Sequence, residues 1–172
     1  MPRRSLLDDI DIIEGFPPVD LQTGANNGDY VSLKNYAGCL VMFHSGVGSN
    51  GEDPTLTLQQ ASDVAGTGVK SLTFTVIFRK QAATSLASTA VWTRTTQTAA
   101  NTYTNTDAAE QSALWVVDVK ASDLDVDGGF DVIRATVADV GGAGAQPGSL
   151  HYILYGARIA RAPADKISAI GN

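Results

Sequence analysis

Eight short runs of apolar and β-branched residues recur along the chain, separated by segments rich in Gly, Asn or Asp. In Ser71–Arg79, large apolar residues occupy every second position from Leu72 to Phe78, and Thr73 and Thr75 lie between them. Alternation at a period of two predicts a strand with one buried and one wetter face, as in an antiparallel sheet. The predicted strands are Tyr30–Leu33, Cys39–His44, Thr55–Gln60, Ser71–Arg79, Ala90–Thr96, Ala113–Val119, Phe130–Val137 and Tyr152–Ala160.

This pattern predicts an all-β fold, an eight-stranded antiparallel β-sandwich, with a jelly roll as the favoured topology. Glycine-rich connections such as Gly66–Gly68 and Gly141–Gly148 supply residues that tolerate positive φ in turns. Ala113–Val119 is apolar at successive positions, so both of its faces are apolar. We therefore expect this strand to be central, or to be covered in part by a neighbour.

The N-terminal segment differs from the rest and divides the chain into an extended arm and hinge (1–28), a sandwich domain (29–162) and a C-terminal tail (163–172). Acids interrupt the apolar residues of Leu6–Ile13, which fit a short helix or an extended arm, and Pro17 and Pro18 favour extended backbone. Exposed apolar residues invite a partner. The candidate partner contacts are Ile10, Ile12, Ile13 and Phe16. The alternative is an arm folded back on its own sandwich, beyond a joint at Gly24–Gly28.

Composition excludes several classes of function. The hydrophobic content of 44% and charged content of 17% are typical of a packed globule. The formal net charge of −6 offers no basic stripe for nucleic acid. The only cysteine, Cys39, leaves no intrachain disulfide, and no apolar run is long enough to span a bilayer. We expect a soluble chain made in a reducing cytoplasm without a secretory signal, and without contact to nucleic acid or membrane.

Two motifs resemble ligand sites but lack the expected context. Gly46–Gly51 matches G-x-G-x-x-G, yet Glu52 and Asp53 follow it where a phosphate site needs a helix N-terminus. Asp123–Gly128 resembles the start of an EF-hand loop, but Arg134 stands at the position of the closing glutamate. A hairpin loop and an acidic turn are the favoured interpretations, and a weak calcium site at Asp123–Asp127 is the alternative for the second.

The sequence contains no recognisable catalytic constellation, so we expect no enzymatic activity and no cofactor. His44 and His151 lack a metal-ligand partner at helical or loop spacing, and we expect edge hydrogen bonds from them. No G-x-S-x-G elbow is present, and Cys39 opens an apolar strand where it packs as a small hydrophobe. Four aromatic residues form a candidate sugar-stacking platform, in which Trp115 is expected to be core: Trp92, Tyr103, Trp115 and Tyr152.

Several phrases of the sequence resemble small virion proteins of tailed bacteriophages. They are Tyr30–Tyr36, Asp53–Asp63, Ala99–Tyr103, Ala113–Val117 and Asp123–Asp131. The resemblance implies a decoration or cement protein, a jelly-roll sandwich that binds the major capsid protein on the capsid exterior as a homo-oligomer, a trimer or a dimer. The segment Pro2–Pro18 departs from that pattern.

Two other classes of function remain open at the level of sequence. A phage tail or receptor-facing sandwich would bind carbohydrate, with Trp92 as its most exposed aromatic residue. A hydrolase would depend on His44 or His151, since a triad assembles from residues distant in sequence. The absence of a nucleophile motif favours a structural or binding protein over a hydrolase.

Overall fold

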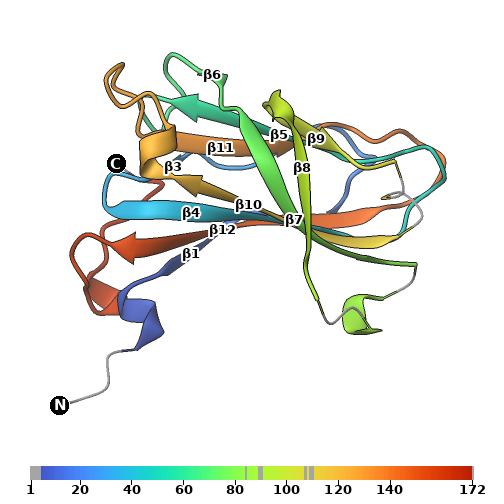
Figure 1. Cartoon of the computed structure of the whole chain (residues 1–172), viewed down its shortest axis with the longest axis horizontal. Coiled ribbons are helices and arrows are strands. Elements are labelled where there is room, and N and C mark those ends of the chain that lie inside the picture. The colour runs from blue at the N-terminus through green and yellow to red at the C-terminus, as the bar shows by residue number, and fades with distance from the viewer. Residues whose placement is uncertain (1–4, 84, 89–90, 107, 109–110, 172) are drawn as a thin grey trace.

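The computed structural model describes the whole chain except residues 1–4, 84, 89–90, 107, 109–110 and 172. Two antiparallel sheets pack face to face with the hydrophobic core between them, which makes the protein a β-sandwich (Figure 1). The helical segments in the described residues are 3-10 turns of three residues each: η1 (Leu6–Asp8), η2 (Leu86–Ser88), η3 (Ala121–Asp123) and η4 (Pro163–Asp165). No helix among the described residues has the length and hydropathy needed to cross a membrane.

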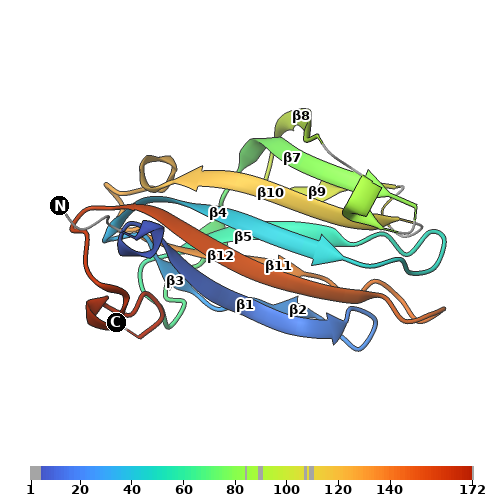
Figure 2. The same cartoon turned by 90° about the horizontal axis from the view of Figure 1, so that it is seen from below.

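The larger sheet, sheet A, has six strands that run side by side along the molecule (Figure 2). Its order from edge to edge is β1 (Asp11–Asp20), β12 (Pro147–Ala157), β4 (Tyr36–Ser45), β10 (Ser112–Lys120), β7 (Phe74–Ala82) and β8 (Thr93–Ala100). The centre of this sheet, β12–β4–β10, is paired without a register shift, so cross-strand neighbours are well defined.

Sheet B is built around two long strands, β11 (Val132–Val137) and β5 (Thr55–Ala61). Short strands complete its edges. β2 (Asn26–Asn27) and β3 (Val31–Ser32) pair with β11, and β6 (Lys70–Ser71) and β9 (Thr102–Thr104) pair with β5.

Each of the eight predicted strands overlaps a strand of the structure, although Ala90 lies outside the described residues and the described strands number twelve. The alternation in Ser71–Arg79 predicts that Phe78 lies on the buried face of its strand, and this prediction is wrong. Phe78 is 36% exposed, whereas Ile77 is fully buried. Phe74 and Ile77 are both buried although they are three residues apart, so the alternation of faces breaks between them, where the pairing of β7 with β8 also shifts register.

The N-terminal segment lies on its own sandwich, which is the second of the two alternatives left open by the sequence. Residues 11–20 form β1, which pairs with β12 at the edge of sheet A. Burial and the neighbouring Asp11 raise the pKa of Tyr36 to about 12. The Tyr36 hydroxyl therefore stays protonated and donates to Asp11 Oδ2 at 3.4 Å, which ties the start of β1 to β4.

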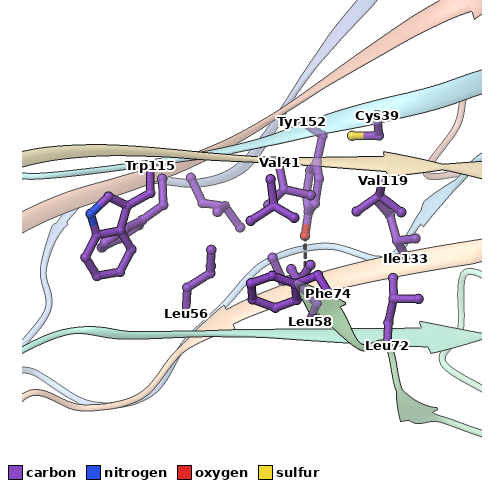
Figure 3. Packing of buried hydrophobic residues seen from close by; sticks show 14 of the residues in the cluster. Cys39, Val41, Leu56, Leu58, Leu72, Phe74, Trp115, Val119, Ile133 and Tyr152 are labelled. Atoms are coloured by element: carbon purple, nitrogen blue, oxygen red, sulfur yellow. Dashed lines mark hydrogen bonds between the residues drawn. The ribbon is translucent and has the colours of Figure 1, made fainter. Parts of the chain in front are cut away.

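The core contains Trp115, which is fully buried, as the sequence predicts (Figure 3). Its ring lies 5.4 Å from that of Phe43 and 4.8 Å, edge-on, from that of Tyr103. Tilted and edge-on arrangements suit the quadrupoles of aromatic rings. Because Phe43 and Trp115 come from sheet A and Tyr103 comes from sheet B, this aromatic cluster joins the sheets at one end of the core.

A buried hydroxyl joins the sheets farther along. Tyr152 of β12 crosses the core, accepts from the Ala135 N–H of β11 at 2.8 Å and donates to the Asp29 carbonyl at 3.0 Å (Figure 3). Burial raises its pKa well above the usual range, so the hydroxyl keeps its proton. A Cβ on Gly28 would lie 2.5 Å from the Tyr152 hydroxyl oxygen and 2.6 Å from the Ala135 carbonyl oxygen. Gly28, the last residue of the predicted joint, is therefore tightly packed between β12 and β11, whereas a Cβ on Gly24 would meet nothing within 4 Å.

We predict that Tyr152→Phe lowers the free energy of unfolding by about 1–3 kcal/mol, because it leaves a buried N–H and a carbonyl without their partner. Urea denaturation followed by tryptophan fluorescence measures this change. Tyr155→Phe in the same strand is the matched control, since its hydroxyl donates to Asp118 at the exposed surface, where water replaces it. Equal losses in the two variants would contradict the role given to Tyr152.

Candidate interaction surface

The outer face of sheet A carries apolar side chains at its centre, with Asp118, Lys80, His44 and His151 among them, and no described strand or sheet covers it. Figure 2 looks onto this face, with η1 and η2 toward its two ends. Neighbours along a strand point to opposite faces, so residues next to the buried Phe43, Trp115 and Tyr152 point outward. We call the following outward residues the apolar face: Ile12, Leu40, Met42, Phe78, Leu114, Val116 and Ile153.

The register aligns these residues in rows across the strands. One row crosses all six strands of sheet A in the order Glu14, His151, Met42, Val116, Phe78 and Arg94. Its middle is apolar, and its two ends carry opposite charges at exposed positions. Neither Glu14 nor Arg94 makes an ion pair with any described residue. The row therefore presents an apolar centre between two uncompensated charges.

The outer face of sheet B is different. Its paired outward residues are Asn27, Thr55, Thr57, Gln59, Thr102, Thr104, Arg134 and Thr136. An antiparallel sheet with one solvated face is expected to be polar there. Sheet B follows that expectation, whereas the outer face of sheet A carries apolar side chains at its centre.

The sequence held the signal for this face. Apolar residues on both faces are predicted for Ala113–Val119, the segment that becomes β10. Two other runs carry the same pattern, Cys39–Phe43 in β4 and Tyr152–Leu154 in β12. What the sequence could not provide is the strand order, which places these runs side by side in one sheet.

The four candidate partner contacts do not form one surface. Phe16 is buried at 6% exposure, and Ile13 packs against the core from a half-buried position. Ile12 is 54% exposed and belongs to the apolar face. Ile10 is half-buried just before β1, and its carbonyl accepts from the Lys166 ammonium of the C-terminal tail.

A second exposed apolar area lies where the two ends of the chain meet. The Arg161 and Ala157 N–H groups donate to the carbonyls of Asp8 and Asp9, which holds the C-terminal tail against η1. We call the exposed apolar side chains of these segments the terminal patch: Leu6 (70% exposed), Leu7 (46%), Ile159 (67%) and Ile167 (49%). Asp8, Ile159 and Ile167 line the same small pocket.

The glycine-rich loop Gly46–Gly51 lies at the opposite end and is held by its following carboxylate. Glu52 accepts from the Gly142 N–H at 2.9 Å, from the Ala143 N–H at 3.0 Å and from Gln22 Nε2 at 2.7 Å. Glu52 therefore joins three loops, and its carboxylate occupies the N–H groups of Gly142 and Ala143.

The carboxylates of the predicted acidic turn have partners within the protein. Asp125 forms an ion pair with Lys70 and accepts from the Gly128 N–H at 3.0 Å. Hydrogen bonding to Lys70 and to Gly128 lowers the pKa of Asp125. Asp123 caps η3 by accepting from the Lys120 N–H at 2.9 Å. Among the described residues, no group of three or more His, Cys, Asp or Glu side chains could hold a metal ion.

The remaining candidate residues are spread over the fold. His44 and His151 both lie within strands on the outer side of sheet A, in adjacent rows. The predicted strand begins at Tyr152, just after His151, whereas β12 begins at Pro147 and contains His151. Cys39 is fully buried, as predicted, and burial raises the pKa of its thiol.

The aromatic platform is not present. Trp115 and Tyr152 are fully buried and Tyr103 is 7% exposed, which leaves Trp92 at 46% exposure. The Lys80 ammonium lies 5.0 Å from the centre of the Trp92 ring. A single ring stacked by a lysine does not form the coplanar aromatic surface that sugar binding needs.

Comparisons with known proteins identify no relative: no protein-family model, no curated protein and no solved structure matches this chain.

We predict that Glu52→Gln loosens the loop end of the sandwich without unfolding it. Loss of a charge-assisted acceptor costs about 1 kcal/mol locally. Amide hydrogen exchange at Gly142 and Ala143 should therefore become roughly fivefold to tenfold faster. Glu14→Gln, at an exposed position without a described partner, is the matched control and should leave that exchange unchanged.

Proposed function

We propose that this chain is a structural protein of a tailed-bacteriophage virion, which decorates the capsid exterior and stabilises it by binding the major capsid protein lattice as an oligomer. The observation that carries the proposal is the apolar face. A six-stranded sheet with an apolar outer face is the surface of a protein that works by assembly. The sequence resemblance to phage virion proteins favours a capsid as that assembly.

The chemistry of the described side chains supports a structural role. Acids lie in backbone caps or in an ion pair with lysine, and the histidines lie along the sheet face with no described partner set for catalysis. The net charge of −6 favours a protein partner over nucleic acid.

The strand order supports the finer assignment to a jelly roll. The chain alternates between sheets, so that β1–β12–β4–β10 lie together in one and β2/β3–β11–β5–β6/β9 in the other. This is the order expected of a jelly roll, with the β7–β8 hairpin inserted between β6 and β9 to widen sheet A. Jelly rolls occur in viral capsid domains but also in lectins, so the fold alone does not determine the function.

We assign a different contact to each of the two exposed apolar areas. The apolar face lies along the long axis of the sheet and suits self-association, whereas the terminal patch lies at one end and suits contact with the capsid (Figure 2). Leu6 and Ile159 are the most exposed large apolar side chains of that patch, at 70% and 67%. Burying each side chain against a capsid subunit would contribute about 1.5–3 kcal/mol before ordering costs, and a lattice repeats that contribution.

We predict that the purified chain co-sediments with heads assembled from the major capsid protein of the same genome. A variant with Leu6→Asp and Ile159→Asp should bind at least tenfold more weakly, because each substitution places a charge in the contact. Val47→Asp is the matched control, since Val47 is 40% exposed in the loop at the opposite end and should bind as the unmodified chain does. Failure of the unmodified chain to bind heads, or its binding to tails, would overturn the capsid assignment.

A further inference from the structure

We infer that a second copy of this chain covers the apolar face, in a two-fold symmetric dimer whose axis lies in the interface, parallel to the strands and between β4 and β10. This inference rests on the self-association part of the proposed function and identifies the surface, the symmetry and the contacts. It does not require that the assembly sit on a capsid.

The size of the face matches a dimer interface. Five spacings of about 4.8 Å separate the six strands, and strands of nine to eleven residues at about 3.3 Å per residue run roughly 30–36 Å. The whole outer face of sheet A, of which the apolar face is the centre, therefore covers about 700–850 Å². A specific interface of standard size buries about 800 Å² on each partner. A second sheet A is an occupant of the same size and shape, and two such faces pack as the layers of a sandwich do, about 10 Å apart with their strands aligned.

The charges select the symmetry. Two in-plane two-fold axes keep the strands of both copies aligned. An axis across the strands would place each strand edge against itself, so that Glu14 would face Glu14 and Arg94 would face Arg94. An axis parallel to the strands reverses their order, so that β1 faces β8 and β4 faces β10. Glu14 of each copy then faces Arg94 of the other, and opposite charges meet at both ends of the row.

The same axis gives the row an apolar centre. Met42 of each copy lies opposite Val116 of the other, because the axis passes between their strands. His151 lies opposite Phe78. An interface with an apolar centre and a charged rim is the arrangement of stable protein contacts, and self-complementarity is what a two-fold contact requires.

The first test is the mass in solution. Light scattering coupled to size-exclusion chromatography, with analytical ultracentrifugation, should give twice the chain mass of 18.0 kDa. Val116→Glu should give a monomer, because it places a carboxylate at the centre of the apolar face. Thr136→Glu, on the polar outer face of sheet B, is the matched control and should remain a dimer; circular dichroism confirms that both variants are folded. A monomeric unmodified chain, a discrete trimer, or a dimer that persists in folded Val116→Glu would each overturn the inference.

The second test addresses the axis and uses only exposed positions. Glu14→Arg and Arg94→Glu should each weaken the dimer about tenfold, since each opposes like charges twice. The double variant should return to within about threefold of the unmodified chain. An equimolar mixture of the two single variants should form a heterodimer more tightly than either associates with itself. If the double variant associates as weakly as the single variants, or the mixture gains nothing, the axis between β4 and β10 is wrong.

The two proposals fail separately. A dimer that binds no heads contradicts the capsid function and leaves the interface standing. A chain that binds heads but remains monomeric in solution contradicts the interface and leaves the capsid function standing.

Discussion

The buried hydroxyl of Tyr152 fixes how the two sheets sit on one another. It bonds to groups of two separate segments, the Ala135 N–H of β11 and the Asp29 carbonyl between β2 and β3, and so joins β12 of sheet A to sheet B. An unpartnered polar group in that position would cost free energy, so the register of the sheets is set by whether both bonds form. The close passage of Gly28 leaves no room for a side chain there. Aromatic packing around Trp115 buries apolar surface at one end of the core. Farther along, the Tyr152 hydroxyl adds hydrogen bonds, which form only in one arrangement of the sheets.

Fixing the inner face also fixes the outer one. Because side chains alternate along a strand, placing Phe43, Trp115 and Tyr152 in the core forces their neighbours outward. In sheet B those neighbours are threonine, glutamine and asparagine, and water solvates them. In the centre of sheet A they include leucine, methionine, valine and isoleucine, with histidine and Asp118 among them. The same alternation therefore gives a polar outer face on sheet B and an outer face with apolar side chains at its centre on sheet A.

Much of the fold could be predicted from the sequence, because the strands have clear periods and glycine-rich turns. The face of β7 could not, because the bulge near Val76 depends on its pairing with β8. The position of the N-terminal segment could not be predicted either. Apolar residues such as Ile12 and Ile13 are expected both in an arm that binds a partner and in a strand that packs on its own sheet. Of the four candidate contacts, Ile12 lies on the apolar face and Phe16 lies in the core. The strongest surface signal lay in Leu40, Met42 and Val116, which become neighbours only when the strand order is known.

The edges of sheet A explain why association is expected through its face. An open edge strand presents unpaired N–H and C=O groups and invites pairing with another chain. Along β1 that route is blocked, because Pro17 has no N–H to donate and the pairing shifts register on both sides of Phe16. At the other edge, the two steps from Phe74 to Val76 in β7 are matched by four steps from Ala100 to Thr96 in β8, so β8 is irregular and a poor template for extension. With both edges blunted and the outer face of sheet B polar, the proposed dimer forms through the apolar face and not through a strand edge.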